Sequence, residues 1–97
     1  GNIVHNLRLV DWEMVKQGFD WAYDFDEYIY KNIMARRPDK ILAFKQESKA
    51  ASLAVPTPDH FYPLLYTLGA SEEGDEISVY NQLADMGSLT MTSYLWE

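Results

Sequence analysis

The segment that most constrains the fold is an amphipathic stretch at residues 20–36, DWAYDFDEYIYKNIMAR. Its large apolar side chains recur every three to four residues, which is the period of an α-helix with one buried face. Asp20 is a suitable N-cap, and Pro38 is expected to stop the helix. Glu27 and Lys31 are spaced to form an ion pair on the helix surface. The residues expected on the buried face are Trp21, Phe25, Tyr28, Ile29 and Ile33.

Two further helices are predicted after this one. Residues 39–48 are expected to form a short helix. Residues 56–70, PTPDHFYPLLYTLGA, are expected to form another, with Thr57 as the N-cap and Gly69 at the end. Pro63 is unfavourable inside this helix, because it removes a backbone donor. The residues expected on its buried side are Leu64, Leu65 and Leu68.

The remaining segments are predicted to supply strands. Residues 77–83 and 88–96 have the composition of β-strands, and residues 2–10 are expected to be the end of a strand that runs into a loop. Residues 49–55 are expected to be a helix end and a loop. The order strand, three helices, two strands predicts the α/β class, with helices packed on a mixed sheet.

Composition excludes several classes of function. Eight basic residues against fifteen acidic ones give a net charge of -7, which repels phosphate backbones, so no nucleic-acid partner is expected. The absence of cysteine excludes disulfides and thiolate metal sites. No apolar run approaches the roughly 20 residues of a membrane span, and the first residues do not resemble a signal peptide. We therefore expect a cytoplasmic protein without membrane association.

The candidate chemical residues are the two histidines and their neighbours. His60 is predicted in a first helical turn, where the helix dipole favours the neutral imidazole that a metal ligand requires. A capping or packing role is the more common one for such a histidine. His5, Asn6 and Arg8 are predicted at the carboxyl end of a strand, where α/β sheets bind ligands, although local backbone hydrogen bonding is the simpler role. Two histidines fall short of the three protein ligands of a typical catalytic metal site.

Three motifs in the chain together resemble a known family. They are GNIVHNLR at residues 1–8, PTPDHFYPLLYTLGA at 56–70 and MGSLTMTS at 86–93. With W-A-x-x-F-x-x-Y in the first helix, they resemble the C-terminal part of the class III extradiol ring-cleavage dioxygenases. The most similar branch is the LigB-like group that includes DOPA extradiol dioxygenases. The resemblance runs nearly end to end, and the order and separation of the two histidine motifs both match.

The resemblance implies roles for matching residues. His60 matches the family's C-terminal metal ligand, and His5 matches an active-site histidine proposed to act in acid–base chemistry beside the bound catechol. Asn6 and Arg8 are the candidate substrate-binding residues. The implied cofactor is one Fe(II) or Zn(II) ion, and the implied substrates are a catechol-type aromatic and dioxygen. The family's other metal ligands lie in an N-terminal half, so residues 1–97 are expected to be a C-terminal part that is inactive alone.

Two other interpretations remain open. The chain could be a non-catalytic LigB-like homologue that serves as a binding or scaffolding module, or a small independent α/β domain. If residues 2–7 are the tail of a strand, the chain has an unpaired sheet edge, and such edges invite pairing with another chain. Trp12, Trp21 and Trp96 are candidates for an uncovered apolar patch. We therefore expect self-association, or pairing with an N-terminal half.

Overall fold

The central element of the computed structural model, which describes residues 1–97, is helix α1 (Asp20–Met34). The predicted apolar face is confirmed, with Trp21 and Tyr28 partly buried at its margin. The predicted ion pair on the exposed side is also present, with 3.3 Å between Lys31 Nζ and Glu27 Oε1. The fully buried residues of α1 are Ala22, Phe25, Ile29 and Ile33.

The ends of α1 differ from the prediction. Phe19 occupies the N-cap position, Asp20 is the first helical residue, and no side chain caps this end. At the other end the helix stops at Met34, before Pro38 can act, because Arg36 adopts a left-handed conformation with φ of 55°. Pro38 instead begins the next helix, α2 (Pro38–Leu42), at a position where its missing N–H costs little.

The segment after α1 is more broken than predicted. The single helix expected at 39–48 is two short helices, α2 and α3 (Phe44–Glu47), because Ala43 departs from helical geometry with φ of -87° and ψ of 18°. The following residues were expected to be a helix end and a loop, but they form a further short helix, α4 (Ala51–Ala54).

The helix expected at residues 56–70 begins later than predicted. The first residues form a 3₁₀ turn, η2 (Pro58–His60), and the α-helix that follows is α5 (Tyr62–Ala70). His60 therefore lies at the end of a 3₁₀ turn, and the prediction of a first α-helical turn is wrong. Pro63 lies in the first turn of α5, where a backbone N–H has no partner within the helix, so the expected cost of the missing donor is small.

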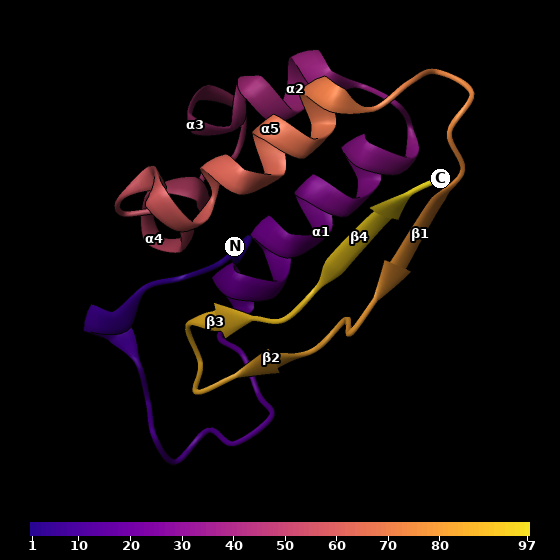
Figure 1. The fold of residues 1–97 in the computed structure, drawn as a ribbon. Helices are drawn as coiled ribbons and strands as arrows, with labels where there is room; N and C mark the ends of the chain where they lie inside the picture. The colour runs from indigo at the N-terminus through magenta and orange to yellow at the C-terminus, as the bar shows by residue number, and fades with distance from the viewer.

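The strands pair as two small antiparallel sheets (Figure 1). Strand β1 (Ile77–Tyr80) pairs with β4 (Ser93–Trp96), and β2 (Ala84–Asp85) pairs with β3 (Leu89–Thr90). The two predicted strands are confirmed in part: the first ends at Tyr80, before the left-handed Asn81 with φ of 54°, and the second is divided into β3 and β4. Gly87, with φ of 77°, turns the chain between β2 and β3.

Residues 2–10 do not form the predicted strand. They contribute one isolated bridge, between His5 and Leu89, and a 3₁₀ turn, η1 (Leu7–Leu9). Pairing with β3 is confined to this bridge, in which the Asn6 N–H donates to the Ser88 carbonyl and the Thr90 N–H donates to the Val4 carbonyl. The fold is accordingly a mixed one of five α-helices and small antiparallel sheets. The mixed sheet that we expected, and the unpaired edge at residues 2–7, are absent.

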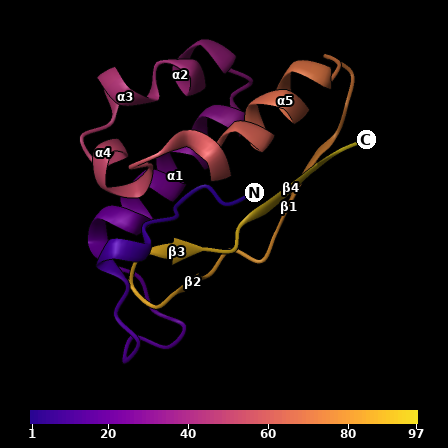
Figure 2. The same cartoon turned by 60° about the vertical axis from the view of Figure 1, so that its left-hand side comes forward.

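The helices gather on one side of the molecule, and the strands run along the other (Figures 1 and 2). The core between them is centred on an aromatic cluster of Phe25, Phe44 and Phe61. The ring centroids of Phe44 and Phe61 are 4.7 Å apart, and both rings lie within about 6 Å of Phe25. This cluster joins α1 and α3 to the residue that directly follows His60.

Exposed apolar side chains concentrate in residues 7–15. Of the three tryptophans expected at an uncovered patch, only Trp12 is well exposed, at 76%, whereas Trp21 and Trp96 pack partly buried against the core. Leu7, Leu9 and Val15 are exposed in the same segment. No helix of the chain has the length and apolar character that crossing a membrane requires.

Candidate functional site

The fold brings the two histidines into contact. His5 and His60 are 55 positions apart in the sequence, yet their imidazole rings stack with centroids 3.7 Å apart and planes 16° apart. Both rings line one pocket of about 380 Å³. All four residues singled out from the sequence belong to this pocket, whose complete lining is His5, Asn6, Leu7, Arg8, Pro56, Thr57 and His60.

His5 is held from both sides through the backbone. Its N–H donates to the carbonyl of Ala54, at the end of α4, over 2.9 Å. The next residue is bound to the other side of the fold: the Asn6 N–H donates to the Ser88 carbonyl over 3.1 Å, and the Ser88 hydroxyl donates back to the Asn6 carbonyl. Because Ser88 is fully buried, this reciprocal pair fixes the His5 segment between α4 and β3.

His60 is exposed, but its backbone is anchored by its neighbours. Phe61 is 1% exposed and packs in the aromatic core, and its N–H donates to the Pro58 carbonyl over 2.9 Å. The carbonyl of His60 accepts the N–H of Asn2 over 2.8 Å. The core thus determines where the imidazole lies, while the ring itself stays open to solvent.

Asn6 and Arg8 are very different in their surroundings. Asn6 is 5% exposed, its Nδ2 donates to the Leu53 carbonyl over 2.7 Å, and its Oδ1 accepts the Arg8 N–H over 3.1 Å. Both polar ends of this amide are therefore engaged by backbone, as in the simpler role that the sequence left open. The Arg8 guanidinium is exposed and makes no hydrogen bond or ion pair within the chain, so it is free to bind an oxygen-rich ligand.

The contact between the histidines affects protonation. Burial lowers the pKa of His5, and the nearby His60 lowers it further, since two imidazolium ions in contact repel each other. The neutral form of His5, in which one ring nitrogen donates and the other accepts, is thereby favoured.

The stacked geometry limits how a metal ion can bind. An imidazole donates its lone pair in the plane of the ring, and metal–nitrogen distances are about 2.0–2.1 Å for zinc. Two nearly parallel rings cannot both direct a lone pair at one ion between them. The residues fit an arrangement in which one imidazole ligates an ion and the other remains free. No cluster of three or more His, Cys, Asp or Glu side chains suitable for a metal occurs in the chain.

Sequence reasoning missed the supports of the site. Ser88 and the carbonyls of Leu53 and Ala54 position His5 and Asn6, but a helix was not predicted at residues 51–54. The signal for Ser88 was present in the MGSLTMTS motif, where a serine follows a glycine inside a strand-like run. No residue of that motif was predicted to have a role in the site, and the structure places it beside residues 4–6.

Comparison with known proteins finds three relatives that share one name. No protein-family model matches the chain. The chain is 38% identical over 95 residues to the 4,5-DOPA dioxygenase extradiol of Escherichia coli K12, covering 96% of the chain and 35% of that relative. It is 27% identical to the protein of the same name from Beta vulgaris and 28% identical to that from Portulaca grandiflora, each over 76% of the chain and 28% of the relative.

A solved structure has the same fold over part of its length. An uncharacterized Escherichia coli K12 protein, JW3007, matches with a TM-score of 0.81 and 36% identity, over 97% of this chain and 39% of that one. The chain thus spans about a third of the length of the curated relatives that it matches.

Proposed function

Because the chain is homologous to the 4,5-DOPA dioxygenase extradiol proteins over about a third of their length, we propose that it is the C-terminal part of an extradiol dioxygenase. In this proposal the whole protein is a non-haem metal enzyme that opens catechol-type aromatic rings with dioxygen. The 97 residues alone are expected to be inactive, since the other metal ligands would come from the rest of the polypeptide.

One observation carries the proposal. The two histidines whose motifs resemble the dioxygenase family meet in a single pocket, although 54 residues separate them in the chain. A capping or packing histidine has no reason to stack on the only other histidine of the chain. The meeting of both motif residues at one solvent-accessible pocket supports a shared chemical role.

The roles of the residues follow from the geometry and the resemblance together. His60 would hold one Fe(II) or Zn(II) ion, because its ring is exposed while its backbone is fixed by Phe61. When bound, such an ion supplies the electronic coupling between a catechol and dioxygen. His5 stays free of the ion and exchanges protons with the catechol hydroxyls, as a neutral imidazole can.

The two candidate substrate-binding residues have different roles in this proposal. Arg8 binds the substrate, since its guanidinium is unpaired and lines the pocket. Asn6 acts as a positioning residue: its Nδ2 joins the His5 segment to α4 through the Leu53 carbonyl, and its Oδ1 already accepts the Arg8 N–H.

We also propose where the rest of the polypeptide lies. Leu7 lines the pocket and is 67% exposed, and Trp12 and Val15 continue the exposed apolar surface at 76% and 63%. Apolar surface of this kind beside an incomplete metal site fits a segment that covers it and brings the remaining ligands. An isolated chain would bury the same surface by self-association.

The test measures dioxygen uptake and metal content separately, in the metal-loaded longer polypeptide that contains this chain. His5→Ala should abolish most dioxygen uptake with a catechol while leaving the metal content near that of the unmodified protein. His60→Ala should remove the metal itself. Equal metal loss in both variants would refute the division of roles. A longer polypeptide that binds neither metal nor catechol would favour the non-catalytic binding module.

A further inference from the structure

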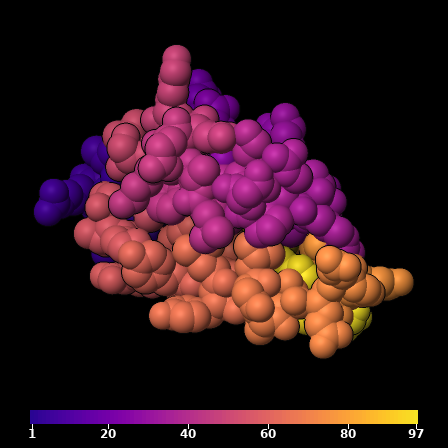
Figure 3. Space-filling view, turned by 90° about the horizontal axis from the view of Figure 1, so that it is seen from above, coloured from indigo at the N-terminus to yellow at the C-terminus, as the bar shows by residue number.

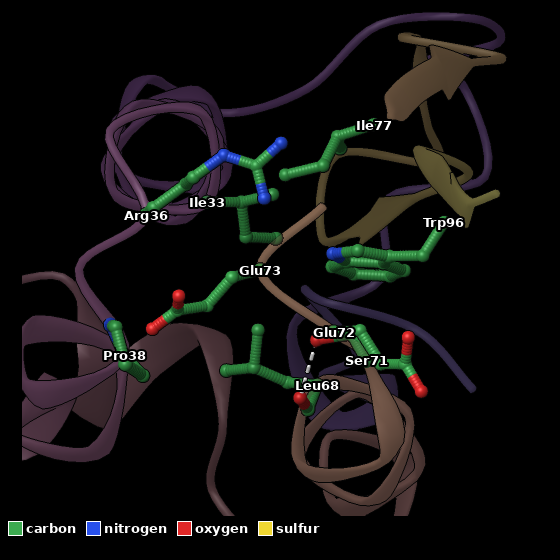
Figure 4. A pocket seen from close by; sticks show the side chains of 9 residues that line it. All are labelled: Ile33, Arg36, Pro38, Leu68, Ser71, Glu72, Glu73, Ile77 and Trp96. Atoms are coloured by element: carbon green, nitrogen blue, oxygen red, sulfur yellow. Dashed lines mark hydrogen bonds between the residues drawn. The ribbon is translucent and has the colours of Figure 1, made fainter. Parts of the chain in front are cut away.

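A second pocket, of about 470 Å³, lies at the opposite end of α5 from His60. Four different elements build it: Ile33 comes from α1, Leu68 from α5, Ile77 from β1 and Trp96 from β4 (Figure 4). The space-filling view shows a hollow between the magenta and the orange parts of the chain. Yellow C-terminal residues are visible inside it (Figure 3). Its volume is within the range of about 300–1,000 Å³ typical of small-molecule sites.

The bottom of this pocket is apolar. Ile33, Leu68 and Ile77 direct aliphatic side chains into it, and the Trp96 indole forms one wall with its nitrogen turned toward the middle (Figure 4). Such a surface accommodates a compact apolar group of a ligand and removes it from water. The indole N–H is also a hydrogen-bond donor available to that ligand.

The rim carries opposite charges that are not paired with each other. The Arg36 guanidinium lies on one side and the Glu73 carboxylate on another, and the Glu72 carboxylate points away on the side opposite Glu73 (Figure 4). The three ion pairs of the chain involve other residues. Arg36 donates one hydrogen bond, from Nη2 to the Asp75 carbonyl, which holds the acidic turn at the pocket while its other donors remain free.

The backbone at Arg36 is left-handed. Its φ of 55° lies in the left-handed region that glycine adopts readily and other residues adopt at a cost. This conformation is a common way to end a helix, and here it turns the chain after α1 at the edge of the pocket that Arg36 lines.

We propose that this pocket binds a free α-amino acid with an apolar side chain, in its zwitterionic form. The Arg36 guanidinium receives the ligand carboxylate, for which its forked donors are suited. Glu73 receives the ammonium group, and the aliphatic side chain packs on Leu68 and Trp96. An anion without the ammonium would leave the Glu73 carboxylate unpaired, and a cation without the carboxylate would leave Arg36 unpaired beside it.

The test uses L-leucine and two analogues that each lack one charge. These are 3-methylbutylammonium, without the carboxylate, and 4-methylpentanoate, without the ammonium group. Binding is followed by NMR through the indole N–H signals of the three tryptophans. L-leucine should shift the Trp96 signal and leave those of Trp12 and Trp21 unchanged, and each analogue should bind at least tenfold more weakly. L-leucine is not a catechol, so the result is independent of the proposed dioxygenase function.

Two variants and a control complete the design. Glu73→Gln should weaken L-leucine binding at least tenfold, whereas Glu13→Gln, the same charge change at an exposed residue outside the pocket, should not affect it. Arg36→Gly should also weaken binding, and because glycine suits this backbone the fold is preserved, which thermal unfolding verifies. The proposal is overturned if L-leucine leaves Trp96 unshifted, if either analogue binds as well as L-leucine, or if both pocket variants retain its affinity.

Discussion

The substitution Asn6→Asp tests the claim that Asn6 positions His5 and does not bind substrate. The change keeps the shape of the side chain and its acceptor for the Arg8 N–H, but it replaces the Nδ2 donor by a carboxylate oxygen. That oxygen would lie 2.7 Å from the Leu53 carbonyl in the present geometry. A favourable hydrogen bond thus becomes a repulsive contact at a site that is only 5% exposed.

The expected loss of stability follows from this geometry. Removing one partner of a buried hydrogen bond costs about 1–3 kcal/mol. For a chain of this size, 1 kcal/mol lowers the melting temperature by roughly 4–8 °C. Taking about 2 kcal/mol, we expect Asn6→Asp to melt about 8–16 °C lower than the unmodified chain near neutral pH. Burial of the new negative charge adds to this loss.

The effect should disappear in acid. Burial and the Leu53 carbonyl would raise the pKa of the introduced carboxyl in the folded state above its value of about 3.9 in the unfolded state. Its penalty is then complete above the folded-state pKa and vanishes below the unfolded one, where the protonated carboxyl can donate to Leu53. Thermal unfolding followed by circular dichroism, near neutrality and at about pH 3, measures both limits.

The matched control is Asn81→Asp. Asn81 is exposed, its side chain makes no hydrogen bond, and its φ of 54° is tolerated by asparagine and aspartate alike. It therefore reproduces the charge change without the lost donor. If Asn6→Asp melts no lower than Asn81→Asp near neutral pH, the positioning role of Asn6 is wrong, and a ligand-binding role regains support.

Three further predictions concern the core, a buried carboxyl and the metal. Phe61→Ala should destabilise the chain by about 3–5 kcal/mol, because the ring is fully buried beside Phe44; chemical denaturation measures this, and a loss below about 1 kcal/mol would contradict the packing. Burial raises the pKa of Asp26, partly opposed by the hydrogen bond from Thr92, so stability falls as the pH rises from the unfolded-state pKa to the raised folded-state pKa. Asp26→Asn should therefore gain stability relative to the unmodified chain between acid and neutral pH, and urea unfolding that shows no such divergence would refute this. The 97-residue chain should bind Zn(II) only weakly through His60, and calorimetry that finds sub-micromolar binding lost in His60→Ala would show that the chain holds a complete site.

Local sequence patterns were sufficient for the parts of the fold whose signals are local. Helix α1 was predicted within two residues at its end because its 3.6-residue period depends on side chains of a single segment. Strands β1 and β4 were recognised from their β-branched and aromatic residues for the same reason. The two histidine motifs also identified the residues that line the His5–His60 pocket.

Only the tertiary structure decided the hydrogen-bond partners of residues 2–6. A strand-like pattern does not say which backbone will pair with it, and here the N–H groups of Val4 and His5 go to Thr90 and Ala54, 86 and 49 positions away. Those long-range bonds fix the segment that carries His5 beside His60. The sequence determined by itself which side chains are available for chemistry, whereas their contact depends on hydrogen bonds and packing between segments that no local pattern encodes.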